Sequence, residues 1–218
     1  MRLHEKYRPR CLDDVVGQPL TPLRALVAKP EPCCVLLEGP TGCGKTTTAY
    51  ALAHELGCYH DAWFESVYPV SGARFDMATL RYYFGPETPF RFRTAGGWHV
   101  LLIEELEQLH PKVQNDAKDA FERELNRYRC IVLATSNNAM RLEKALRHRF
   151  KTYTFSAGQC FAEAACERLA RIWQQETGGV DLPHGWQKWG WDGDEFSLRR
   201  ALDTMQDHLT LLEQGVLV

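Results

Sequence analysis

The sequence predicts an α/β fold in which a parallel β-sheet is covered by helices and followed by a smaller helical part. Two patterns lead to this prediction. Along residues 1–155, short apolar runs alternate with helical segments, which is the arrangement that builds a parallel sheet. Beyond residue 155 this alternation stops, and two helical apolar stripes follow. We therefore expect two domains: an α/β core with an N-terminal arm at 1–155, and a small helical domain, called the lid below, at 156–218.

Strands of the core are expected where apolar residues continue without interruption. These runs are residues 33–37, 62–70, 98–103, 130–134 and 153–155. Helices are expected between them, at 47–56, 75–84 and 111–126. In the last of these, Pro111 suits the first helical position, and Val113, Ala117 and Phe121 form one apolar stripe. Residues 1–30 contain several prolines and predict an irregular arm with one short helix.

The lid is expected to contain two amphipathic helices, at 161–176 and 197–212. Each carries apolar residues at helical spacing along one face. The connection between them is rich in tryptophan, with Trp186, Trp189 and Trp191.

The composition is that of a globular protein with a core, since 44% of the 218 residues are hydrophobic and 25% are charged. The formal net charge of −2 excludes a protein-wide basic field, so any nucleic-acid contact must come from a local patch. No apolar run approaches the roughly 20 residues of a membrane helix, and the N-terminus has no secretion-signal pattern. Eight cysteines occur without C-x-x-C spacing, which predicts reduced core thiols rather than a zinc site. We therefore expect a cytoplasmic protein with no membrane partner.

The most informative segment fits the Walker A pattern G-x-x-x-x-G-K-[ST]. It consists of Gly39, Pro40, Thr41, Gly42, Cys43, Gly44, Lys45, Thr46 and Thr47. It follows an expected strand and opens an expected helix, the context in which backbone N–H groups bind phosphate. Lys45 is expected to reach the β- and γ-phosphates, and the Thr46 hydroxyl to bind Mg²⁺. The alternative is a chance glycine-rich turn, but motif and context agree, so we predict that the chain binds a nucleoside triphosphate.

Two further strands are expected to end in polar residues at the same edge of the sheet, where ligands of α/β folds bind. Glu104 and Glu105 follow an apolar strand and look like a Walker B motif, in which the first acid supports the metal and the second positions or deprotonates the attacking water. Asn137 follows the strand at 130–134 and is expected to hold that water near the γ-phosphate. The alternatives are two acids that cap a strand end and an asparagine that serves a turn.

Six segments, in order and with matching spacing over most of the chain, carry a family resemblance. They are Glu5–Gln18, Gly39–Thr46, Ile103–Glu105, Ala134–Asn137, Ala145–Phe150 and Phe196–Asp203. These segments resemble clamp-loader AAA+ ATPases, in particular the small subunits of replication factor C. The resemblance implies a P-loop AAA+ module, ATP and Mg²⁺ as ligands, and assembly with identical or different AAA+ subunits into a ring or spiral.

The resemblance also implies roles for further residues. The adenine pocket would be lined by Tyr7, Arg8, Pro9, Val15 and Val16. Asn137 would be the residue called sensor 1. Arg149, with Arg147 as the fallback, would be the arginine finger that enters a neighbouring subunit's site and neutralises transition-state charge. The alternative for Arg149 is membership of an exposed basic cluster that includes Arg141, Lys144, Arg147, His148 and Lys151.

The last predicted helix resembles the family's sensor 2 helix. Arg199 lies on the flank of its apolar face, whereas Arg200 points further away. A flank position lets a side chain touch phosphate while its helix packs, so Arg199 is expected to be sensor 2. A solvated arginine is the alternative.

The sequence departs from the family pattern in two respects. The first Walker B acid is Glu104, where the family usually has Asp, and the longer side chain is expected to disturb the metal shell and slow hydrolysis. The chain stops at Val218, just past the second lid helix, so we expect the family's C-terminal helical collar to be absent.

Three functions follow as hypotheses. The first is an ATP-hydrolysing subunit of a clamp-loader-like assembly, associated with the nucleoid or replisome, that loads a sliding clamp on primer–template DNA. The second is an AAA+ ATPase that remodels DNA in recombination or repair, and the third is a nucleotide-binding switch that hydrolyses poorly. The helix at 111–126 carries both basic and acidic residues and predicts only a modest salt-dependent DNA contact per subunit.

Overall fold

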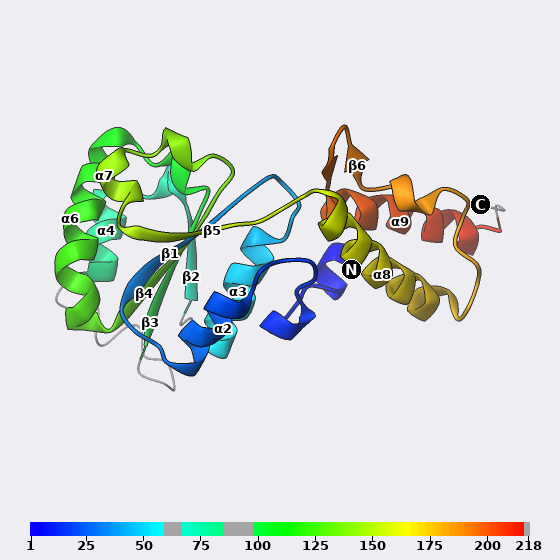
Figure 1. Ribbon diagram of the computed structural model, residues 1–218, viewed down its shortest axis with the longest axis horizontal. Coiled ribbons are helices and arrows are strands. Elements are labelled where there is room, and N and C mark those ends of the chain that lie inside the picture. Colours follow the sequence, from blue (N-terminus) through cyan, green and yellow to red (C-terminus); the bar gives the residue numbers. More distant parts are fainter. Residues whose placement is uncertain (59–66, 85–97, 216–218) are drawn as a thin grey trace.

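The computed structural model describes residues 1–58, 67–84 and 98–215. Within these ranges, five parallel strands form one sheet in the order β2-β3-β4-β1-β5 (Figure 1). Their bounds are β1 Cys33–Glu38, β2 Val67–Ser71, β3 His99–Glu104, β4 Cys130–Ser136 and β5 Phe150–Thr154. Helices cover both faces of the sheet, and a helical part lies beyond one of them. The predicted fold class is confirmed.

The two faces of the sheet build separate cores, because consecutive side chains of a strand point to opposite faces. In β1, Cys33 and Val35 enter one core, and Cys34 and Leu36 enter the other. The first face is covered by α2 (Thr21–Ala28) and α3 (Lys45–Glu55). The second is covered by α4 (Met77–Phe84), α6 (Pro111–Tyr128) and α7 (Lys144–Arg147). Coverage on both sides explains why the central strands are apolar along most of their length.

The helical part at the C-terminal end consists mainly of α8 (Gln159–Thr177) and α9 (Leu198–Glu213). Their buried residues, such as Leu169 and Leu202, belong to the same apolar cluster as the α3 face of the sheet. The N-terminal helix α1 (Leu3–Lys6) lies beside α9, and the backbone N–H of Leu3 donates to Gln206. The arm therefore bridges the core and the lid, while the domain division at 155/156 stays a prediction.

Several element bounds differ from the prediction. Residues 62–66 of the expected strand at 62–70 lie outside the described residues. The helix expected at 75–84 begins at Met77, where the Asp76 carboxylate accepts the backbone N–H of Thr79 as a cap. Strand β5 begins at Phe150 rather than at residue 153, because Phe150, Lys151 and Thr152 also pair with β1 at the edge of the sheet.

Short elements complete the described part of the chain. A two-stranded antiparallel ribbon, β6 Trp191–Asp192 and β7 Glu195–Phe196, occupies the tryptophan-rich connection. The 3₁₀ turns are η1 Leu12–Asp14, η2 Gly72–Arg74, η3 Leu106–Gln108, η4 Ala139–Arg141 and η5 Trp186–Lys188. Over the described ranges, none of the helices has the length and apolar character needed to span a membrane.

Candidate nucleotide-binding site

A cavity of about 330 Å³ opens where the carboxyl end of the sheet meets the arm and the lid. Most of the predicted site residues line it: Tyr7, Arg8, Pro9, Val15, Val16, Thr41, Gly42, Cys43, Gly44, Lys45, Thr46, Thr47, Glu104, Glu105, Asn137 and Arg199. Gly39 and Pro40 are not among the lining residues, but their carbonyls contact Lys45. Arg149 does not line the cavity. The structure thus gathers residues from three strand ends, the arm and the lid around one space.

Two glycines of the phosphate loop are required by close contacts with other segments. A Cβ at Gly39 would lie 2.4 Å from the carbonyl oxygen of Phe155, just after β5. Gly42 has φ +84°, and a Cβ there would lie 2.0 Å from the Ser197 hydroxyl, at the start of α9. The Gly42 carbonyl also accepts the backbone N–H of Leu198 at 3.2 Å. The loop therefore contacts the lid directly at Gly42, where a side chain would not fit.

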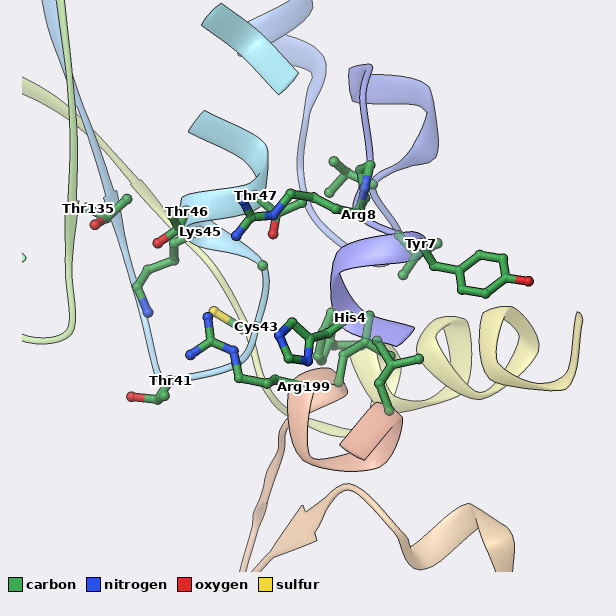
Figure 2. A pocket seen from close by; sticks show the side chains of 18 of the residues that line it. His4, Tyr7, Arg8, Thr41, Cys43, Lys45, Thr46, Thr47, Thr135 and Arg199 are labelled. Carbon is green, nitrogen blue, oxygen red and sulfur yellow. The ribbon is translucent and has the colours of Figure 1, made fainter. Parts of the chain in front are cut away.

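Lys45 opens α3 and points along the loop toward the end of the sheet (Figure 2). Its ammonium donates to the carbonyls of Gly39 and Pro40, at 2.7 and 2.6 Å, and to Asn137 Oδ1 at 2.9 Å. The residue is only 7% exposed, and burial lowers the pKa of its ammonium. A buried cation held by neutral oxygens is well placed to exchange them for phosphate oxygens, which are stronger charge-assisted acceptors.

The two acids after β3 have different surroundings. Glu104 is half-buried and lies beside Tyr50 of α3: burial and the negative charge of Glu104 raise the pKa of the Tyr50 hydroxyl to about 12. Glu105 is exposed and has a left-handed backbone, with φ +55°, which is uncommon for a residue with a side chain. Its carboxylate accepts the Gln108 amide at 2.6 Å, and its backbone N–H donates to the Thr135 hydroxyl. Glu104 is thus placed near the α3 wall, and Glu105 nearer the open side.

Asn137 follows β4 immediately and connects two parts of the site. Its side-chain oxygen accepts the Lys45 ammonium, and its backbone N–H donates to Glu107 Oε1 at 3.0 Å. The asparagine is therefore held from both sides at the carboxyl edge of the sheet.

The arm contributes two side chains, Tyr7 and Arg8, that point in different directions. Figure 2 shows Arg8 reaching toward the phosphate loop, whereas the Tyr7 ring points away from it. The Arg8 guanidinium lies 5.3 Å from the centre of the Tyr50 ring, a cation–π contact. The Tyr7 hydroxyl donates to Glu176 of α8, and burial together with this bond raises its pKa to about 12. Tyr7 lines the cavity while its hydroxyl fastens the arm to the lid.

The lid places Arg199 on the side of the cavity opposite Arg8. In Figure 2 the Arg199 side chain extends from the start of α9 toward the loop near Cys43. Ser197 begins this helix, and its hydroxyl accepts the backbone N–H of Arg200 as an N-cap. Arg200 itself turns outward and pairs with Asp192 at 2.9 Å, as the helical spacing indicated.

Arg149 lies apart from these residues, at the turn between α7 and β5. Its guanidinium pairs with Glu122 of α6 at 2.5 Å, and its side chain is 41% exposed. Arg147, the fallback, contacts the sulfur of Met140 at 2.7 Å. Neither arginine is directed into this chain's own cavity.

Sequence reasoning did not single out several residues that line the cavity, among them His4, Asp14, Thr135, Phe161 and Arg168. Thr135 lies within the segment that ends in Asn137, so its position could have been found. Arg168 and Phe161 lie on the lid helix α8, and no motif marks them. They reach the cavity only because α8 packs beside the arm.

The residues present fit a magnesium ion that arrives with a nucleotide. Thr46 and Glu104 both line the cavity and offer hydroxyl and carboxylate oxygens, the hard ligands that Mg²⁺ prefers. In the part of the chain that the structure describes, no group of three His, Cys, Asp or Glu side chains forms a separate metal site. Mg²⁺ needs no such group, since it binds through one or two protein oxygens, waters and phosphates.

The sequence model of the ATPase family associated with various cellular activities (AAA) matches residues 35–156. The chain belongs to this family. The match begins within β1 and ends after β5, so it covers most of β1, the other four strands and the phosphate loop.

Relatives of this AAA chain include subunits of replication factor C. The small subunit from Thermofilum pendens is 27% identical, over 93% of this chain and 61% of its own length. Subunit 3 from Blastobotrys adeninivorans is 28% identical, over 97% of this chain and 61% of its own length. The predicted similarity to replication factor C small subunits is confirmed. This chain spans about three fifths of the length of these two relatives.

Solved structures confirm the AAA+ fold. The Thermotoga maritima RuvB Holliday junction branch migration motor has a TM-score of 0.67 at 21% identity, over 95% of this chain and 67% of its own. Domain III of the Thermotoga maritima replication initiation protein DnaA has a TM-score of 0.62 at 15% identity, over 90% of this chain and 84% of its own. At these identities the likeness concerns the fold alone.

Proposed function

We propose that this chain is an ATP-hydrolysing AAA+ subunit of a clamp-loader-like assembly that acts in DNA replication and loads a sliding clamp on primer–template DNA. One observation carries the ATPase part: Lys45, Glu105 and Asn137 converge from the sheet on one cavity, and Arg199 enters it from the lid. A phosphate-binding cation, a base, a water-holding amide and a second cation are the groups that phosphoryl transfer uses. The similarity to replication factor C subunits over most of the chain supports the type of assembly.

In this proposal each residue of the cavity has a stated task. The loop N–H groups and Lys45 bind the phosphates, and the ammonium leaves the carbonyls of Gly39 and Pro40 to do so. Thr46 and Glu104 hold the magnesium ion, which neutralises phosphate charge when bound. Glu105 orients or deprotonates the attacking water, and Asn137 fixes its position. The adenine is enclosed by Tyr7, Arg8, Pro9, Val15 and Val16.

The proposal divides the complete site between two subunits. Arg149 is exposed and lies outside this chain's cavity, which supports a role in the cavity of a neighbour. The lid, proposed at 156–218, brings Arg199 to the bound phosphates from the same chain. Neighbouring AAA+ subunits, identical or different, then form a ring or spiral around DNA. The eight free thiols support a reducing, cytoplasmic location.

Steady-state ATP turnover, measured with and without primed DNA and candidate clamps, tests the proposal. Stimulation that requires both DNA and clamp supports clamp loading. Stimulation by DNA alone would replace it with a DNA-remodelling function of the kind that the name of the RuvB motor describes. Tight ATP binding with flat turnover would replace it with a nucleotide-binding switch, in which Glu104 weakens the metal site. Mass measurement with ATP, for the chain alone and with candidate partners, gives the subunit number.

A further inference from the structure

Glu107 is a third acid after β3, in the 3₁₀ turn η3. Its Oε1 accepts the backbone N–H of Asn137 at 3.0 Å. The side chain of the same Asn137 accepts the Lys45 ammonium at 2.9 Å. Two hydrogen bonds in sequence thus connect η3, through Asn137, to the phosphate loop.

The other carboxylate oxygen of Glu107 is buried and, within the described residues, has no hydrogen-bond partner. Native structures rarely bury an acceptor without a partner, so this oxygen calls for an explanation. The charge of Glu107 also reaches the phosphate loop. Burial lowers the pKa of the Lys45 ammonium, while Cys43 and then Glu107 act in the opposite direction. Glu107 therefore acts on two residues of the cavity, although it does not line the cavity itself.

The backbone of Asn137 depends on this carboxylate because the sheet ends just before it. Strand β4 ends at Ser136, whose carbonyl still accepts the N–H of Gly39, and Asn137 is the first residue beyond the strand pairing. Its N–H turns to Glu107 instead of a neighbouring strand. Without Glu107, this N–H would face water, and Asn137 would be held only through its side-chain contacts with Lys45 and Thr41.

We propose that Glu107 is a positioning residue: it fixes the Asn137 backbone so that the side-chain amide faces Lys45 and the attacking water. The effect on hydrolysis rests on the proposed ATPase function, whereas the effect on Asn137 does not. A hydrogen-bond acceptor performs this task, so glutamine at position 107 substitutes for glutamate and alanine does not.

The kinetic test compares Glu107→Ala and Glu107→Gln with the unmodified full chain, in the assembly that shows ATP turnover. We expect Glu107→Ala to lower kcat by about 10–100-fold, since displacing a catalytic group by about 1 Å costs this much. The Kd of fluorescently labelled ATP should stay within about threefold, because the phosphate loop and Lys45 are retained. Glu107→Gln should restore most of kcat. In an Asn137→Ala background, Glu107→Ala should have little further effect, because both changes remove the same group.

A second measurement tests the same inference on the chain without turnover. Hydrogen exchange of the Asn137 amide, followed by NMR, should be about tenfold faster in Glu107→Ala and near normal in Glu107→Gln. Glu163→Ala is the matched control, because it removes an acid that accepts the Gln159 amide on α8, away from the cavity. Unchanged Asn137 exchange in Glu107→Ala overturns the proposal, and so does a glutamine variant as impaired as alanine. If the unmodified chain has no turnover under any condition, the ATPase proposal fails, and the exchange measurement still decides the role of Glu107.

Discussion

Two cations proposed for the same reaction have opposite environments. Lys45 is buried in this chain's cavity and is held by two carbonyls and by Asn137. Arg149 is exposed, lies outside the cavity, and is paired with a single carboxylate on α6. The first is fixed by two carbonyls of its own loop and by a side chain at the end of β4, and the second by a surface ion pair of the kind that contributes little stability.

This difference is the one that the proposed division of the site between two subunits requires. A residue that works within its own chain can be held in place by the fold before the ligand arrives. A residue that acts in a neighbouring subunit's site must stay accessible. Breaking its contact within its own chain must also cost little free energy. The surroundings of Lys45 meet the first requirement, and those of Arg149 meet the second.

The largest expected effect belongs to Arg149. In the assembly, Arg149→Ala should lower ATP turnover by about 10³-fold, the lower end of the range for arginine fingers, because transition-state charge is left without its cation. ATP affinity of the isolated chain should be unchanged, since Arg149 does not line the cavity. Arg141→Ala is the control, as it removes a charge from the same basic cluster. The measurements are the ATP turnover of the assembly and the Kd of the isolated chain for ATP. An equal loss of turnover in both variants would favour the basic-cluster interpretation over the arginine finger.

Lys45→Ala should change binding in the isolated chain. Its charge-assisted hydrogen bonds to phosphate are each worth about 1.5–3 kcal/mol, so the Kd for ATP should rise by roughly 10–100-fold. Lys151→Ala is a matched control, because this lysine is exposed and pairs with Glu31. Isothermal titration of both variants makes the measurement. An ATP affinity of Lys45→Ala within twofold of the unmodified chain would refute the proposed phosphate site.

Gly42→Ala tests the contact between the loop and the lid. The new Cβ would lie 2.0 Å from the Ser197 hydroxyl, so either the loop or the start of α9 must move. The alanine would also have to keep the backbone angle φ +84°, which residues with a side chain rarely adopt. Strain of this kind costs about 1–3 kcal/mol, which lowers Tm by several degrees in a chain of this size and weakens ATP binding by about tenfold. Gly193→Ala is the control, since its φ is +58° but nothing lies within 4 Å. It should lower Tm slightly and leave ATP binding unchanged; equal loss of binding in both would show that the contact with Ser197 is not what matters.

The sequence predicted those parts of the fold and site that depend on local pattern. Strands β1 and β4 were predictable because both faces are buried and the runs 33–37 and 130–134 are apolar without interruption. The phosphate loop was predictable because its residue types and their spacing directly determine phosphate binding. The start of β5 was not, since Lys151 and Thr152 are exposed and only pairing with β1 makes the segment a strand.

Contacts between distant segments could not be predicted from local pattern. Glu107 meets Asn137 only because β3 and β4 are neighbours in the sheet and end at the same edge. Glu122 meets Arg149 because α6 covers the face of the sheet on which α7 also packs. In both cases the partner is an acid among many, and nothing in its spacing distinguishes it from a solvated side chain.

The smallest expected effect comes from the resting partner of Arg149. An exposed ion pair is worth about 0–1 kcal/mol, so Glu122→Gln should raise turnover of the assembly by at most about fivefold at low salt, because Arg149 is then free before assembly. The difference should disappear at about 1 M salt, where the charges are screened. Glu31→Gln, which removes an exposed pair with Lys151, should have no effect at either salt concentration. Lower turnover in Glu122→Gln would mean the opposite: Glu122 then holds Arg149 in the orientation that it needs in the neighbour's site. Turnover measured over a series of salt concentrations separates the two cases.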